Sequence, residues 1–159
     1  MVSLRKINEK NVWKLLALEV FEEQKDFVAS NTVSLVEAYI TLAEGGHVMP
    51  FGIYDGETPV GFVMLGYGDE PDSGNPPIAE DNYCLWRLMI DRAHQKKGYG
   101  RQAVRLALEY IRTFPCGKAE ACWVSFEPEN RVAAELYHSF GFRENGDTCD
   151  GESVAVLKL

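Results

Sequence analysis

Gln95-Lys96-Lys97-Gly98-Tyr99-Gly100 is a glycine-containing turn between a predicted strand, Tyr83 to Ile90, and a predicted helix, Arg101 to Arg112. The first N–H groups of a helix lack partners within it, and the helix dipole places partial positive charge there, so a helix N-terminus attracts phosphate. Gly98 and Gly100 have no Cβ, which lets a bulky anion approach the backbone. The turn therefore predicts a pyrophosphate cradle, with added charge from Lys96, Lys97 and Arg101.

A dinucleotide site is the first alternative, because the segment from Gly98 to Ala103 also matches the fingerprint G-x-G-x-x-A. That fingerprint requires its first glycine directly after the strand, and an acidic residue about 20 residues later at the end of the next strand. Here the segment from Asp91 to Lys97 separates the strand from the glycine, and Glu120 begins the next apolar run. The chain also contains no G-x-x-x-x-G-K-[S/T] pattern. The spacing therefore disfavours a nucleotide-binding domain of either kind.

A longer pattern, from Leu88 to Arg101, resembles the acetyl-CoA signature of the GNAT family of N-acetyltransferases, Q/R-x-x-G-x-G/A after a strand. The segment from Pro128 to Phe142 resembles the family's second motif, N-x-x-A-x-x-L-Y-x-x-x-G-F, with Asn130, Ala133 and Tyr137 at motif positions. Both motifs occur in the family's order with a strand between them. The resemblance covers roughly the whole chain and implies an acetyl-CoA-dependent N-acetyltransferase.

The resemblance also implies which residues bind acetyl-CoA. Backbone N–H groups around Leu88 to Ile90 would polarise the thioester carbonyl. Tyr137 would donate a hydrogen bond to the departing sulfur, and no metal is implied. The implied cofactor-binding set is Leu88, Met89, Ile90, Gln95, Lys96, Lys97, Gly98, Tyr99, Gly100, Arg101, Asn130, Ala133 and Tyr137.

Two segments, Tyr83 to Ile90 and Gln24 to Leu35, resemble bacterial spermine/spermidine acetyltransferases of the Blt type. A polyamine acceptor follows from that resemblance, since carboxylates and aromatic rings suit a flexible dication. The acceptor contacts it implies are Glu22, Glu23, Asp26, Tyr83 and Trp86, with Phe27 nearby. The alternative is that the carboxylates form a solvated helix end and the aromatic residues belong to the core. An aminoglycoside or other small amine, a protein N-terminus, and a non-catalytic acyl-CoA-binding sensor remain alternatives.

The general base is not assigned by either motif. Several family members have a glutamate in the strand before the cofactor turn, at a position that aligns nearest Cys84, and this chain lacks it. Glu80 and Asp81 precede that strand and Glu127 ends the next one, and each could accept a proton directly or through water. We favour Glu127, because it lies beside the splay expected between the two strands.

Length and composition set the remaining bounds. With 159 residues, 46% of them hydrophobic, one domain spanning 1–159 is expected. A net charge of −8 disfavours nucleic acid and is compatible with a cationic substrate. No apolar run is long enough to cross a membrane and no signal-peptide pattern begins the chain, so a cytoplasmic protein is expected. The four cysteines form no C-x-x-C pair, which argues against a zinc site.

The expected fold is a mixed α/β fold: a mostly antiparallel sheet of about seven strands with helices on both faces, the GNAT fold. Asn8, Ser34 and Asn130 are the expected caps of the first, second and fourth helices. The edge strands of the C-terminal hairpin could pair with a second copy, so a homodimer remains open. Strands are expected at 4–7, 47–54, 59–67, 83–90, 119–126, 142–149 and 152–159, and helices at 9–18, 35–43, 101–112 and 130–140.

Overall fold

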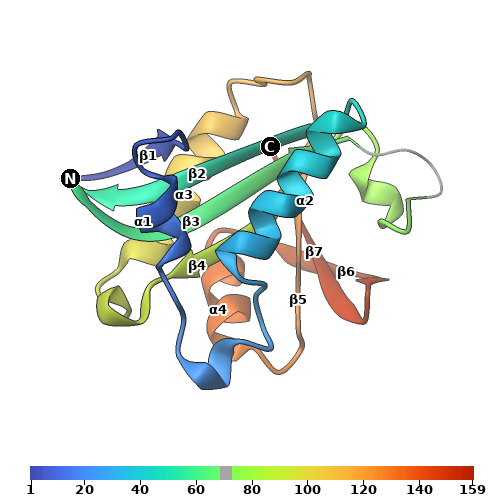
Figure 1. Ribbon diagram of the computed structural model, residues 1–159. Helices are drawn as coiled ribbons and strands as arrows, with labels where there is room; N and C mark the ends of the chain where they lie inside the picture. Colours follow the sequence, from blue (N-terminus) through green and yellow to red (C-terminus); the bar gives the residue numbers. More distant parts are fainter. Residues whose placement is uncertain (69–72) are drawn as a thin grey trace.

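The computed structural model describes residues 1–68 and 73–159. Seven strands form one sheet in the order β1-β2-β3-β4-β5-β7-β6 (Figure 1). Only β4 and β5 pair in parallel, and the other neighbours are antiparallel, which confirms the predicted mixed sheet. The strands are β1 (Val2–Lys6), β2 (His47–Asp55), β3 (Thr58–Tyr67), β4 (Tyr83–Ile90), β5 (Ala121–Phe126), β6 (Arg143–Cys149) and β7 (Glu152–Lys158).

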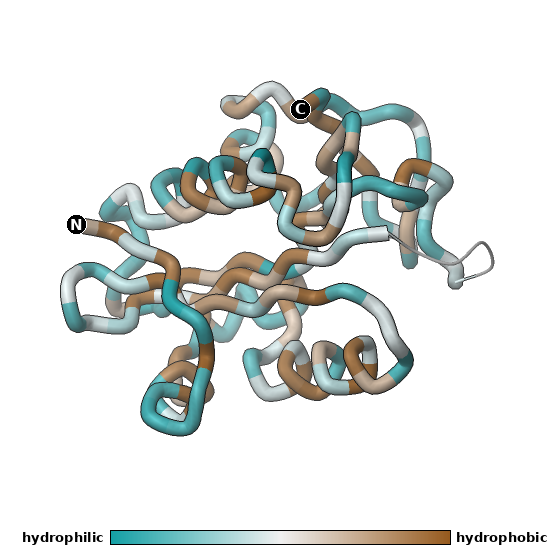
Figure 2. Tube along the Cα trace, turned by 90° about the horizontal axis from the view of Figure 1, so that it is seen from above, coloured by the Kyte–Doolittle hydropathy of each residue, from teal (hydrophilic) through white to brown (hydrophobic). Residues whose placement is uncertain are grey.

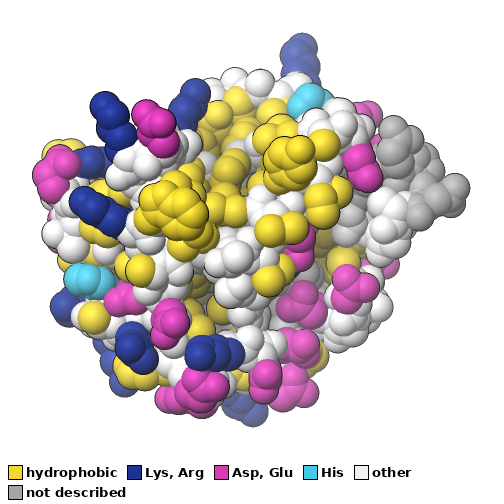
Figure 3. Space-filling view, in the orientation of Figure 1, with side chains coloured by type: hydrophobic (Ala, Val, Ile, Leu, Met, Phe, Trp, Pro, Cys, Tyr) yellow, Lys and Arg dark blue, Asp and Glu magenta, His cyan; other side chains and the backbone are white. Residues whose placement is uncertain are grey.

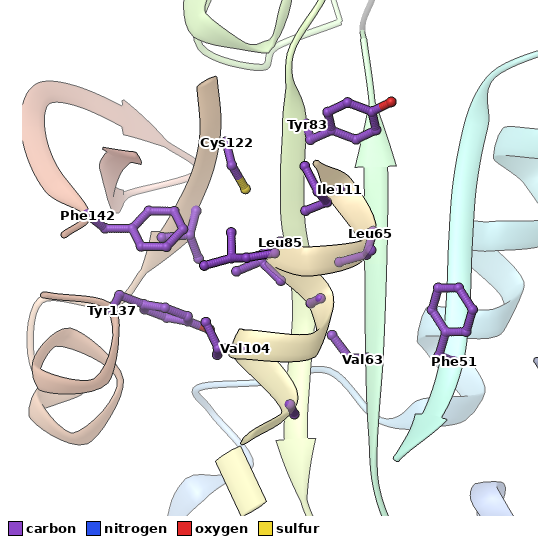
Figure 4. Packing of buried hydrophobic residues seen from close by; sticks show 14 of the residues in the cluster. Phe51, Val63, Leu65, Tyr83, Leu85, Val104, Ile111, Cys122, Tyr137 and Phe142 are labelled. Carbon is purple, nitrogen blue, oxygen red and sulfur yellow. The ribbon is translucent and has the colours of Figure 1, made fainter. Parts of the chain in front are cut away.

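Helices cover both faces of the sheet, as predicted (Figure 2). α1 (Val12–Leu16) and α2 (Asn31–Ala43) lie on one face, and α3 (Tyr99–Ile111) and α4 (Arg131–Ser139) pack on the other. The run from Phe62 to Leu65 is apolar at every position because successive strand residues point to opposite faces, and here both faces are covered. Its alternate members join two different clusters of buried residues. Figure 4 shows part of the cluster on the α3 side.

The first helix is shorter than predicted and does not begin after Asn8. The Asn8 Oδ1 accepts from the Lys10 N–H at 2.9 Å, while the Asn11 Oδ1 accepts from the Asn8 N–H at 2.9 Å. Asparagine side chains that bond to nearby backbone favour turns over helix. The two asparagines therefore hold a turn, and the helix runs only from Val12 to Leu16.

The second helix begins one turn earlier than predicted, because Ser30 caps it and Ser34 does not. The Ser30 Oγ accepts from the Val33 N–H at 3.2 Å. Asn31, at the first position, is buried and donates its side-chain N–H to the Leu15 carbonyl at 2.8 Å. This bond between α1 and α2 fixes where α2 starts, and Ser34 lies buried inside the helix.

Two irregularities in β4 shape the region around it. β4 pairs with β5 only at Tyr83–Cys122 and Cys84–Trp123, after which the strands separate. The β3–β4 register shifts between Met64 and Leu65, which leaves Trp86 as an extra residue on β4. The expected splay between the two strands is therefore present. Between β3 and β4 the described residues contain a 3₁₀ turn at Pro77–Ala79.

Candidate active site

A single cleft begins where β4 and β5 separate, and it extends along the turn that follows β4. Leu88, Met89 and Ile90 line it from β4, and the start of α4 lines it from the other side. Most residues of the predicted cofactor set meet here: Leu88, Met89, Ile90, Gln95, Lys96, Gly98, Tyr99, Gly100, Arg101, Asn130, Ala133 and Tyr137. Two motifs far apart in sequence thus share one cavity.

The glycine turn has the geometry of an anion cradle. Gly98 is the N-cap of α3 with φ +83°, and no side chain caps the first N–H groups of this helix. A Cβ built on Gly98 would meet nothing within 4 Å, so the space beside it is open. Free N–H groups at the start of a helix, beside open space and cations, suit a phosphate. The residues present therefore fit the pyrophosphate of a coenzyme A.

Gln95 ties this turn to the rest of the site. Its side-chain N–H group donates to the Ile90 carbonyl at 3.0 Å and to the Gln24 Oε1 at 2.7 Å. The Gln24 amide returns a hydrogen bond to the Gln95 Oε1 at 3.0 Å. Gln24 belongs to the 3₁₀ turn Glu22–Gln24, in the segment predicted to cover the acceptor. The amide pair therefore joins the segment before α2 directly to the turn before α3.

The flanking residues of the turn are held by partners within the protein. The Tyr99 hydroxyl donates to the Asp55 Oδ2 at 2.6 Å, and this bond raises the pKa of Tyr99 and lowers that of Asp55. Arg101 donates to the Ser139 Oγ at 2.9 Å and lies over the Phe140 ring. Lys97 donates to the Ala93 carbonyl and does not line the cleft. Of the three predicted cations, Lys96 and Arg101 remain in the lining.

Tyr137 reaches the cleft from α4. Asn130 caps this helix as predicted, since its Oδ1 accepts from the Ala133 N–H at 3.3 Å. The Tyr137 ring packs between Phe126 and Phe142 and points toward α3 (Figure 4). Within residues 1–68 and 73–159 its hydroxyl has no hydrogen-bond partner. Burial raises the pKa of the phenol, so Tyr137 stays protonated and keeps a donor available.

The predicted acceptor residues divide into two groups. Asp26 and Trp86 line the cleft, together with Phe27. Glu22 and Glu23 are exposed and do not line it, and the Glu22 carboxylate pairs with Lys25 at 2.7 Å. Tyr83 must be corrected: it is fully buried in the core. Its hydroxyl donates to the Gly117 carbonyl at 2.8 Å, so it fastens the loop before β5 and cannot contact an acceptor.

The bulge in β4 adds an ion pair that the sequence did not reveal. Strict alternation would place Trp86 and Arg87 on opposite faces of the sheet. The extra residue turns both toward α2, where Arg87 donates to both oxygens of Glu37, the shorter bond being 3.0 Å. Arg87 also lies 5.7 Å from the centre of the Trp86 ring. This pair closes part of the cleft wall beside the predicted acceptor region.

Several carboxylates line the cleft around the end of β5 and the start of β7, and two of them, Glu127 and Glu152, differ in that only Glu127 was predicted. Glu127, which follows β5, lies in the cleft lining as expected. Glu152, the first residue of β7, also lines it and accepts from the Ser125 Oγ at 3.2 Å. Burial raises the pKa of Glu152. One sequence signal could have found it: Glu152 shares the period of Val154 and Val156 and therefore sits on an otherwise apolar face of its strand.

Membrane-spanning helices and metal-binding clusters are both absent from the described ranges 1–68 and 73–159. No helix there is long and apolar enough to cross a membrane. The same ranges contain no group of three or more His, Cys, Asp or Glu side chains placed to hold a metal ion. None of the four cysteines, all within these ranges, is part of a disulfide. His47 and His94 also line the cleft, at positions to which the sequence assigned no role.

Comparison with known proteins decides the family. Residues 6–142 match the model of the acetyltransferase (GNAT) family. The chain belongs to the GNAT family of acetyltransferases. It is 29% identical to the spermine/spermidine N(1)-acetyltransferase of Bacillus subtilis strain 168, over 99% of each chain. Membership supports an N-acetyltransferase that uses acetyl-CoA as co-substrate.

Solved structures share the fold at low identity. AAC(6')-Ib in complex with ribostamycin and coenzyme A superposes with a TM-score of 0.78, at 19% identity over 99% of this chain and 93% of that one. The spermidine N-acetyltransferase of Vibrio cholerae, in complex with coenzyme A and spermine, gives a TM-score of 0.67 at 19% identity, over 99% and 95% of the two chains. Such distant likeness establishes the GNAT fold.

Proposed function

We propose that this protein transfers the acetyl group of acetyl-CoA to a primary amine of a polyamine such as spermidine or spermine, by direct attack in a ternary complex. One observation carries the proposal: the anion cradle, several carboxylates and Tyr137 all line a single cleft. The polyamine relative from Bacillus, matched over nearly its whole length, favours the same class of acceptor.

Charge in the cleft suits both substrates. Lys96 and Arg101 stand at the end that would hold the pyrophosphate. Asp26, Glu127 and Glu152 face the cleft elsewhere, where ammonium groups would bind. Figure 3 shows acidic side chains gathered below α2, on the side toward the β6–β7 hairpin. A negative surface raises the local concentration of a cationic acceptor.

Removing a proton from the ammonium group costs more free energy than the departure of the thiol. An alkyl ammonium with a pKa of about 10.4 is protonated at pH 7, and neutralising it costs roughly 4–5 kcal/mol. A thiol with a pKa of about 8.5 leaves with modest help. The carboxylate base should therefore lower the activation free energy by more than the acid does. Glu127 is the base that the sequence favours. Tyr137 lines the cleft and its raised pKa keeps the phenol protonated, which supports a role for it in assisting the sulfur.

The steps balance as follows. The ammonium gives one proton to the base, and the free amine nitrogen forms a bond to the thioester carbon. The carbonyl oxygen gains negative charge, which N–H groups of β4 near Leu88 to Ile90 would stabilise. The C–S bond then breaks and the Tyr137 hydroxyl gives its proton to the departing sulfur. The nitrogen loses its second proton, which returns to the Tyr137 oxygen and restores the phenol. One proton remains on the base and passes to solvent.

The test is release of free thiol from acetyl-CoA in the presence of spermidine, spermine, putrescine, an aminoglycoside, a peptide with a free N-terminus, or no acceptor. Turnover confined to the polyamines is expected. Turnover only with the aminoglycoside or the peptide would contradict the proposed polyamine acceptor but would still support acetyl transfer to an amine. Binding of acetyl-CoA without turnover on any amine would favour an acyl-CoA-binding sensor.

A further inference from the structure

We propose that Glu152, at the start of β7, is the general base that takes the ammonium proton, in place of the strand-β4 carboxylate whose position is held by Cys84. The inference rests on the proposed function, because it assumes that an amine is acetylated in the cleft. Nothing in the sequence motifs points to Glu152, and the comparisons assign it no role.

The sheet register places Glu152 on the face from which an acceptor would enter. Ser125 of β5 lies opposite Val154 of β7, so these two side chains share a face. Glu152 precedes Val154 by two residues and points to the same side. Trp123, Val154 and Cys84 pack together on that face. Glu152 therefore lies across β5 from β4, level with the end of β5 where β4 and β5 have already separated, and on the same face of the sheet as Cys84.

Tyr137 approaches the same gap from the opposite face. It belongs to the cluster of buried residues on the α3 side, whereas Glu152 lies on the other side of the sheet. The two groups are close enough that the charge of Glu152 helps to raise the pKa of Tyr137. An acetyl thioester lying in the gap would have a carboxylate on one side and a phenol on the other, the arrangement that amine deprotonation and thiol departure require.

The surroundings of Glu152 raise its affinity for a proton. Burial is the largest cause of its raised pKa, and the negative charges of Glu127, after β5, and Asp150, in the β6–β7 turn, act in the same direction. The Ser125 hydrogen bond and the positive charge of Arg87, on β4, oppose them. A carboxylate with a raised pKa is a stronger base than an ordinary glutamate. Glu127 then acts indirectly, because its negative charge helps to keep the pKa of Glu152 raised.

The experiment compares Glu152→Gln, Glu152→Asp and Glu127→Gln with wild-type protein. The readouts are the pH profile of kcat/KM, on any amine that the wild type acetylates, and the dissociation constant of acetyl-CoA. Glu152→Gln is expected to lower kcat/KM by about 10²-fold or more, with acetyl-CoA binding within about twofold, and to abolish the fall in rate at acid pH. Glu152→Asp keeps a carboxylate and should recover part of the rate.

Glu127→Gln tests whether Glu152 acts as the base, because a purely structural role of Glu152 predicts no shift in the pH profile. It removes a negative charge that raises the pKa of Glu152, so the acid limb of the profile should move to lower pH. Glu135→Gln, an exposed carboxylate on α4 outside the cleft, is the matched control and should leave the profile unchanged.

Three outcomes overturn the inference. A Glu152→Gln protein with kcat/KM within about threefold of the wild type and an unchanged acid limb removes the role. A large loss and a missing limb in Glu127→Gln alone would assign the base to Glu127. A wild-type protein that acetylates no amine would contradict the proposed function, and this inference with it. An active wild type with an unaffected Glu152→Gln variant would contradict this inference alone.

Discussion

Gly98 and Gly100 stand in the same turn, yet their backbones place different demands on a side chain. Gly98 has φ +83°, a conformation that a residue with a Cβ adopts at a cost of roughly 1–2 kcal/mol. Gly100 lies inside the first turn of α3, and a Cβ there would meet Leu136 at 3.7 Å and Ile90 at 3.9 Å, which is ordinary contact. The family pattern, which accepts Gly or Ala at the second position, agrees with this difference.

Alanine at the two glycines should therefore have opposite effects on stability. Gly98→Ala is expected to lower the free energy of unfolding by about 1–2 kcal/mol and to weaken binding of acetyl-CoA, because the strain falls on the cradle. Gly100→Ala should raise the free energy of unfolding by up to about 1 kcal/mol, since alanine favours helix. Urea unfolding and a binding titration measure both. Equal losses of stability in the two variants would contradict this account of the turn.

Tyr137 offers a second prediction for a single residue. Tyr137→Phe keeps the ring between Phe126 and Phe142 and removes a hydroxyl that has no partner within the described residues. Stability should change little, while kcat falls by about 10²-fold, the contribution of a positioned acid. The KM for acetyl-CoA should change much less. Because the pKa of the phenol is raised, its ionisation should produce no fall in rate near neutral pH.

The control for this variant is Tyr110→Phe, which removes a partly buried phenol outside the cleft. It should leave kcat unchanged. A Tyr137→Phe protein with normal turnover would show that the sulfur leaves without help from this hydroxyl.

Between elements, the contact that matters most for the site is the Gln24–Gln95 amide pair. It connects the 3₁₀ turn Glu22–Gln24 to the turn that precedes α3 through two hydrogen bonds, at 2.7 and 3.0 Å. Asp91 adds a second connection, because its Oδ1 accepts from the Glu19 N–H at 2.9 Å. The segment that contains Glu19 and Gln24 is therefore held to the turn before α3, although the two are far apart in sequence.

A double-mutant cycle measures this connection. Gln24→Ala and Gln95→Ala should each lower the free energy of unfolding, and the double variant should lose less than their sum by about 1 kcal/mol. The corresponding cycle of Gln24→Ala with Gln102→Ala should be additive, since the Gln102 side chain has no hydrogen bond within residues 1–68 and 73–159. Additivity in the Gln24–Gln95 cycle would mean that the two turns are held independently.

For the whole molecule, the decisive property is that β4 and β5 pair over two residues and then part. A sheet that stayed closed would satisfy the backbone of β4 along its length and leave no cavity. Because it opens, one cleft receives side chains from both faces of the sheet and from both sequence motifs. β6, at the edge of the sheet, remains available for pairing with a second copy, as the sequence also suggested.

The sequence by itself determined the features that depend on neighbouring residues. The strand–turn–helix around Gly98, the cap at Asn130 and the two hairpins follow from local backbone preferences, and the structure has them where they were predicted. The mixed sheet with helices on both faces followed from the order of these elements and from the family resemblance. The first two helices were less well predicted because several polar residues competed as caps, and a contact between α1 and α2 decided where α2 begins.

Only the tertiary structure decided which side chains share the cleft. The bulge that turns Trp86 and Arg87 to one face arises from the pairing of β4 with β3, and no pattern within β4 reports it. Tyr83 looked like an acceptor contact and proved to be a core anchor, because its environment is supplied by the loop before β5. Glu152 lies near Tyr137 only because β7 pairs beside β5. Local preferences act over a few residues, whereas sheet register joins residues distant in sequence, so the chemistry of the cleft depends on the folded sheet.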